Sequence, residues 1–135
     1  MADGIHVKNE EFEKIPHNIE AEQALLGTLL INNDVYEQIS SIVRANHFYE
    51  PVHSKIFEII TNKIQKNALA SPVTIKPYFD NDEALNELGG ASYLARLAGS
   101  AISSLAAKDF AELIEDTSKR RSLIYLAKEI SDKAN

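Results

Sequence analysis

The stretch of sequence that decides the fold is KDFAELIEDTSKRRSLIYLAKEISDK, residues 108–133. It contains no glycine and no proline, the residues that disfavour the interior of a helix most strongly. Its apolar residues recur at three- and four-residue steps, which is the spacing of a helix face. They are Phe110, Leu113, Ile114, Leu123, Ile124, Ala127 and Ile130. The sequence therefore predicts a long C-terminal helix over residues 106–135.

This helix is too long for the rest of the chain to cover. At about 1.5 Å per residue it would span roughly 35–40 Å, whereas only 105 residues precede it in a chain of 135. Part of its apolar surface therefore needs a partner helix, either later in a longer parent chain or on another copy. We expect a concentration-dependent dimer that forms partly through this helix.

Shorter helices, about six in number, are predicted before residue 105, and no stretch of useful length alternates like a strand. Pro51 suits the first position of a helix, and Gly89-Gly90 can supply the left-handed conformations that end one. The predicted ranges are about 19–31, 34–44, 51–67, 74–79, 82–88 and 93–99. The fold class is thus all-α, with a flexible leader over residues 1–14, a helical globular head over 15–105 and the long helix over 106–135.

Gly27 falls in the middle of the first predicted helix. Glycine there costs up to about 1 kcal/mol relative to alanine. Its presence indicates that another backbone segment packs closely against the helix at that point.

The composition narrows the classes of function. The absence of cysteine excludes disulfides, thiolate metal sites and a thiol nucleophile, and it fits a reducing cytoplasm. No window has the apolar length of a signal peptide or a membrane span, so we expect a cytoplasmic protein that is neither secreted nor membrane-bound. A formal net charge of −6 argues against strong binding to nucleic acid, which depends on clustered basic residues.

The one basic cluster is Lys119-Arg120-Arg121. We interpret it first as the solvated face of a helix, since Glu115 and Asp116 lie just before it. The alternative is a helical DNA-binding module that uses these three side chains.

Residues suited to catalysis or metal binding are not grouped in any useful pattern. No glycine precedes a lysine as in a phosphate-binding loop, and the histidines are not paired at the i, i+4 spacing of a zinc site. Asp80-Asn81-Asp82 opens like a calcium loop, but Leu85 occupies the position that requires glycine. His53 is interpreted as a buried histidine that bonds the segment before it. We therefore expect no catalytic, cofactor or metal site, and a small helical enzyme is the least supported hypothesis.

One segment has a specific likeness to a known family. IPHNIEAEQALLG, residues 15–27, resembles the opening signature of the N-terminal domain of DnaB-type replicative DNA helicases, Pro-His-x-x-Glu-Ala-Glu-x-x-x-Leu-Gly. Further matches follow in order to about residue 132: Phe48-Tyr49 with His53, Ile56 and Phe57; Pro72-Val73-Thr74-Ile75; Leu88-Gly89-Gly90 with Tyr93-Leu94; and Arg121 with Leu123-Ile124.

The chain departs from the family pattern in places. Residues 101–107 differ from the family's usual turn before the long helix, and Phe110 replaces a common tyrosine. Pro77 interrupts a segment that is usually a plain helix, so we expect an irregular short helix there.

The resemblance implies a helical head followed by a helical hairpin, of which the long helix is the first half. Six copies would form a collar, a trimer of dimers, that organises the helicase hexamer and docks primase, with a helicase loader as a further candidate partner. ATP and magnesium would bind only to a motor domain that this chain lacks, so the chain itself would not be an enzyme. The candidate interface residues are Phe110, Leu113, Ile114, Arg120, Arg121, Leu123 and Ile124.

Overall fold

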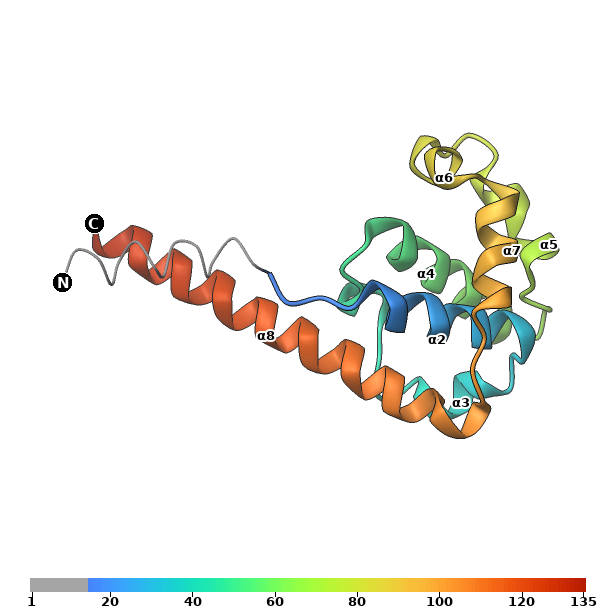
Figure 1. Cartoon of the computed structure of the whole chain (residues 1–135), viewed down its shortest axis with the longest axis horizontal. Coiled ribbons are helices and arrows are strands. Elements are labelled where there is room, and N and C mark those ends of the chain that lie inside the picture. Colours follow the sequence, from blue (N-terminus) through green and yellow to red (C-terminus); the bar gives the residue numbers. More distant parts are fainter. Residues whose placement is uncertain (1–14) are drawn as a thin grey trace.

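Helix α2 (Ile19–Ile31) lies at the centre of the computed structural model, which describes residues 15–135 (Figure 1). It begins after Asn18 because the Asn18 side chain accepts the Ala21 N–H at 2.9 Å and so satisfies one free donor of the first turn. Most of the helix is buried, from Ala21 to Leu30, so it is covered on several sides. Its bounds confirm the predicted range of 19–31.

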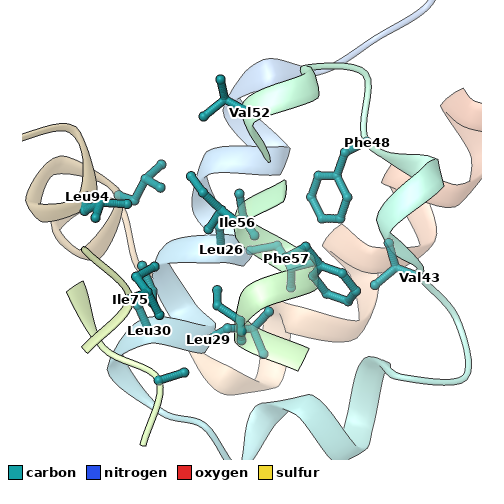
Figure 2. Packing of buried hydrophobic residues seen from close by; sticks show 14 of the residues in the cluster. Leu26, Leu29, Leu30, Val43, Phe48, Val52, Ile56, Phe57, Ile75 and Leu94 are labelled. Atoms are coloured by element: carbon teal, nitrogen blue, oxygen red, sulfur yellow. The ribbon is translucent and has the colours of Figure 1, made fainter. Parts of the chain in front are cut away.

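Three helices cover α2: α4 (Pro51–Gln65), α7 (Ala91–Gly99) and α8 (Ala107–Ala134). Each of them directs apolar side chains into one common core, part of which Figure 2 shows around Leu26 and Ile56. Leucine and isoleucine side chains without exposed surface form its centre: Leu25, Leu26, Leu29, Ile39, Ile56, Ile60, Ile75, Leu85 and Leu94. Such burial contributes roughly 1.5–3 kcal/mol for each side chain before entropy is subtracted. The all-α fold class is confirmed for the described residues.

The second predicted helix, 34–44, is shorter than expected. Helix α3 (Val35–Ile39) ends after five residues, and a turn follows in which the N–H groups of Ile42 and Val43 both bond to the Ile39 carbonyl. Serines occupy positions 40 and 41, and serine competes poorly in a helix because its hydroxyl favours turns. The turn also brings Val43 into the core. A short 3₁₀ turn, η1 (Ala45–His47), then leads to α4.

The predicted helix at 74–79 starts earlier than expected and has two parts, α5 (Pro72–Ile75) and the 3₁₀ turn η2 (Lys76–Phe79). It starts at Pro72 because the side chains of Ser71 and Thr74 each accept the other's backbone N–H. Pro77 has no N–H with which to continue the α-helical pattern. The expected irregularity at Pro77 is confirmed. Helix α6 (Glu83–Leu88) lies within the predicted range of 82–88. The Asp82 side chain caps its start, and Gly89 with its positive φ ends it, as predicted for the glycine pair.

Gly27 lies where α2 crosses α7. A Cβ atom on this residue would lie 1.8 Å from the carbonyl oxygen of Leu97, far inside van der Waals contact. The next residue strengthens the same junction, because the Thr28 hydroxyl accepts the Ile102 N–H at 2.9 Å. The predicted close approach of a second backbone is confirmed.

Helix α8 begins inside the head, just after the 3₁₀ turn η3 (Ser104–Ala106), and ends outside it. Ala107, Ala111, Ile114 and Arg121 are buried, whereas no residue from 122 to 135 is. Its 28 residues are about 42 Å long at about 1.5 Å per residue, and Figure 1 shows the C-terminal half projecting well past the other helices. The predicted head, residues 15–105, thus shares its core with the first half of α8. None of the helices within residues 15–135 is both long and apolar enough to cross a membrane. The leader predicted at 1–14 lies outside the described residues.

Candidate functional site

The projecting half of α8 carries a row of uncovered apolar side chains. Leu123, Leu126 and Ile130 are 66%, 53% and 60% exposed. At 3.6 residues per turn they lie on one side of the helix, together with the exposed Ala127. We call these four residues the distal face. Contiguous exposed apolar surface often marks an interaction site, whereas single exposed apolar residues are common on any protein.

The predicted interface residues do not form one stripe. Ile114 is buried and Phe110 is packed against the core, so both face the head. Nine residues separate Ile114 from Leu123, which is two and a half turns of helix, so Leu123 points to the opposite side. The apolar run in the sequence therefore represents two faces of α8, one used by the head and one uncovered.

The remaining predicted interface residues have different surroundings. Leu113 is partly exposed and Ile124 is half-buried. Arg120 is exposed and pairs with Asp116 at 2.9 Å. Arg121 is buried and bonds backbone carbonyls of the head, so its interpretation as part of a solvated helix face is wrong for this residue. That these seven residues form an interface with another chain stays a prediction.

An open groove of about 450 Å³ lies beside the distal face. One wall is the C-terminal part of α8, with Leu123 and Leu126, and the other is the connector between α3 and α4, with Asn46 and His47. Burial lowers the pKa of the His47 imidazole, which leaves Nδ1 free to accept the Arg44 N–H at 2.9 Å. This bond and the one from the His47 N–H to the Arg44 carbonyl close the turn η1 beside the groove.

Arg121 joins α8 to this connector. Its guanidinium donates to the carbonyl oxygens of Pro16 at 3.1 Å and His47 at 2.7 Å. It also lies over the ring of Tyr49, 5.5 Å from the centroid, and the same ring stacks on His17 at 4.2 Å. We call Arg121, Pro16, His17 and Tyr49 the latch. The spacing of seven residues from Ile114, two turns of helix, is a signal in the sequence that could have placed Arg121 on the head side.

Glu22 holds the connector from the α2 side. Its buried carboxylate accepts the backbone N–H groups of Tyr49 at 2.7 Å and Glu50 at 3.3 Å. It also bonds Nδ1 of His53 at 2.9 Å, and Nε2 of His53 lies 2.5 Å from the Tyr93 hydroxyl. Burial raises the pKa of Tyr93, so its hydroxyl stays protonated and can donate to His53. The carboxylate of Glu22, both ring nitrogens of His53 and the hydroxyl of Tyr93 then all have hydrogen-bond partners.

The prediction for His53 is confirmed in part. The side chain is fully buried, as expected. It reaches the connector only through Glu22, however, because its two nitrogens are used by Glu22 and Tyr93. No local signal predicts that a glutamate of α2 lies between His53 and the connector.

The basic cluster offers little free positive charge. Lys119 lies 3.6 Å from Glu115, Arg120 is paired with Asp116, and Arg121 is used by the latch. Asp80 and Asp82 are likewise paired with Lys76 and Lys55. Within residues 15–135, no group of three histidine or acidic side chains is arranged to hold a metal ion.

Comparison with known proteins gives consistent matches. Residues 14–116 match the family model described as the DnaB-like helicase N terminal domain. The replicative DNA helicase DnaB of Rickettsia felis is 35% identical over 120 residues, which are 89% of this chain and 24% of the relative. That of Treponema pallidum is 28% identical over 88% of this chain and 27% of the relative. The chain spans about a quarter of the length of these relatives.

Solved structures share the fold. The N-terminal domain of DnaB helicase from Mycobacterium tuberculosis matches with a TM-score of 0.81 at 24% identity, over 88% of this chain and 86% of that one. A DnaB-like replicative helicase, described with its interactions with primase, matches with a TM-score of 0.70 at 26% identity, over 87% of this chain and 28% of that one. Since the family model covers most of the described residues and the curated relatives agree, the chain belongs to the family of DnaB-like helicase N-terminal domains.

Proposed function

We propose that the chain is a non-catalytic interaction domain of a cytoplasmic replicative DNA helicase, in which α8 pairs copies of the chain and the domain organises a hexamer and docks primase. The observation that carries the proposal is the distal face, an apolar surface on a projecting helix. Membership of the family supports the role in replication. The relative described with its interactions with primase supports that partner. A helicase loader is a second candidate partner, and the second helix of the hairpin would lie in a longer parent chain.

The energetics favour weak pairing. In a symmetric dimer each copy contributes Leu123, Leu126 and Ile130. Burying such side chains yields roughly 1.5–3 kcal/mol each, while association costs about 4–15 kcal/mol in lost freedom of motion. The two quantities are similar, so we expect a dimer whose population depends on concentration.

Sedimentation of the wild type and of Leu123→Asp tests the pairing. The wild type is expected to dimerise in the micromolar range, and the variant to remain monomeric because a charge would be buried against apolar surface. Ile124→Asp, at the half-buried neighbouring position, is expected to weaken association less.

Tyr125→Asp is the matched control. Tyr125 is a large side chain that is exposed, like Leu123, but it lies about two hundred degrees around the helix from Leu123. It should associate like the wild type. A wild type that stays monomeric at high micromolar concentration, or a Leu123→Asp variant that associates equally well, would remove the distal face from the proposal.

The chain alone is expected not to hydrolyse ATP. None of its glycines precedes a lysine, so it has no phosphate-binding loop of the usual kind; ATP and magnesium belong to the proposed motor domain. Phosphate release should equal that of a buffer blank. Turnover that follows the protein through repeated purification would contradict the assignment as a non-catalytic domain.

Direct DNA binding is the weaker alternative. It would have to use Lys119, Arg120 and Arg121, of which two are paired with acids and one is buried. A steep salt-dependent affinity for duplex DNA at submicromolar protein would restore this alternative.

A further inference from the structure

We propose that Arg121 is a positioning residue, and that the latch fixes the direction in which the projecting half of α8 leaves the head. Arg121 is the last buried residue of α8, at 6% exposure, and the 13 helical residues after it project away. The direction itself does not depend on self-association, but the use of that direction in pairing subunits rests on the proposed function.

Arg121 makes two hydrogen bonds and one contact with an aromatic ring. Two hydrogen bonds run from its two terminal nitrogens to the backbone carbonyls of Pro16 and His47, which belong to separate segments of the chain. The guanidinium also lies over the Tyr49 ring, 5.5 Å from its centroid, within the range of a cation–π contact. Arginine is suited to this role because its planar, rigid fork can bond two acceptors while stacking on an aromatic ring.

The connector and the segment before α2, which Arg121 bonds, make further hydrogen bonds and stacking contacts of their own. Glu22 accepts the N–H groups of Tyr49 and Glu50, so the connector is bonded to α2. His17 stacks on Tyr49 and its Nδ1 bonds the Ile15 carbonyl at 2.7 Å. The segment before α2, the connector and α8 are therefore joined at one point.

The larger contacts of α8 with the core end well before Arg121. Phe110 packs against the core, and Ile114, the last large aliphatic side chain within it, lies two turns before Arg121. Beyond Arg121 only Ile124 is partly buried. The projecting part is about 20 Å long at about 1.5 Å per residue. A tilt of roughly 20° at Arg121 would thus move its end by about 7 Å, more than a side chain at an interface can accommodate.

The experiment measures the distance between the head and the end of the helix by double electron–electron resonance. The chain contains no cysteine, so Glu87→Cys on α6 and Ser131→Cys on α8 provide two specific sites for spin labels. Both positions are exposed. Labelled protein is diluted with an excess of unlabelled protein, so that only distances within one chain are recorded whether or not the chain pairs.

Arg121→Ala is expected to broaden the distance distribution about twofold, because the projecting helix then pivots on smaller contacts. Arg120→Ala is the matched control: it removes the same charge one residue away, at an exposed side chain that is paired with Asp116. Its distribution should equal that of the wild type. Tyr49→Leu, which keeps both hydrogen bonds of Arg121 but removes the ring, should give an intermediate width.

A distribution for Arg121→Ala as narrow as that for Arg120→Ala would overturn the proposal, since a role in stability alone lowers the melting temperature without widening the distribution of folded molecules. If Arg121→Ala does not fold, Arg121→Lys and Tyr49→Leu decide, because lysine keeps the charge but cannot bond both carbonyls as a fork. Narrow distributions in both would equally overturn it. Sedimentation of the same variants tests the pairing alone. A wild type that never dimerises contradicts the proposed pairing but not the positioning role of Arg121.

Discussion

Gly27→Ala is expected to lower the free energy of unfolding by about 3 kcal/mol or more, the upper part of the range for overpacked cores. The added Cβ would lie 1.8 Å from the Leu97 carbonyl oxygen and 2.7 Å from its carbonyl carbon. Both atoms are backbone and cannot rotate away, so α2 and α7 must separate. That separation would also stretch the bond between Thr28 and Ile102. Urea unfolding followed by circular dichroism at 222 nm gives the difference.

Gly99→Ala is the control for this substitution. Gly99 ends α7, and a Cβ there would meet no atom within 4 Å. Because alanine favours a helix over glycine by up to about 1 kcal/mol, this variant should be as stable as the wild type or slightly more so. Equal stability of the two variants would mean that the crossing of α2 and α7 is looser than described.

Glu22→Ala is expected to lower the free energy of unfolding by about 3 kcal/mol or more, because each buried donor left without an acceptor costs about 1–3 kcal/mol. The substitution leaves the N–H groups of Tyr49 and Glu50 and the Nδ1 atom of His53 without their shared acceptor. Folded domains of this size are stable by only about 5–15 kcal/mol, so the variant should be unfolded or nearly so at 37 °C. The same urea titration measures the loss, and amide exchange at residues 49 and 50 locates it.

Two further variants separate the buried carboxylate from ordinary helix effects. Glu20 lies in the same first turn but is exposed, so Glu20→Ala should cost at most about 1 kcal/mol through the helix dipole. Glu22→Gln keeps an acceptor oxygen and should give an intermediate loss. If Glu22→Ala and Glu20→Ala were equally mild, the carboxylate would have no part in holding the connector.

Local sequence signals predicted much of the fold. Helix α2 has the predicted bounds because Asn18 caps it and Asn32 ends it, and both signals are read from neighbouring residues. Pro51 at the start of α4 and Gly89 at the end of α6 were predicted in the same way. Gly27 was informative because glycine has no local reason to stand in the middle of a helix.

The functional contacts could not be predicted in this way, since they join residues far apart in the sequence. Arg121 bonds a carbonyl 105 positions earlier, and Glu22 bonds amides 27 and 28 positions later. The division of α8 into two faces also escaped prediction, because the apolar residues before and after the basic cluster were read as one run. The structure gives the signature residues Pro16, His17, Glu22 and Gly27 separate physical roles, in the latch, the connector and the crossing of two helices.

Amide hydrogen exchange of the unmodified chain, at protein concentrations below and above the expected dimerisation, tests the central claim that the projecting half of α8 pairs copies of the chain. The amides of residues 122–134 should exchange quickly in dilute protein, since an uncovered helix end gains little from propensity alone. At high concentration their exchange should slow, while that of α4 and α7 in the head stays unchanged. Slowing confined to the head, or no change at residues 122–134 in a sample that sediments as a dimer, would contradict the account.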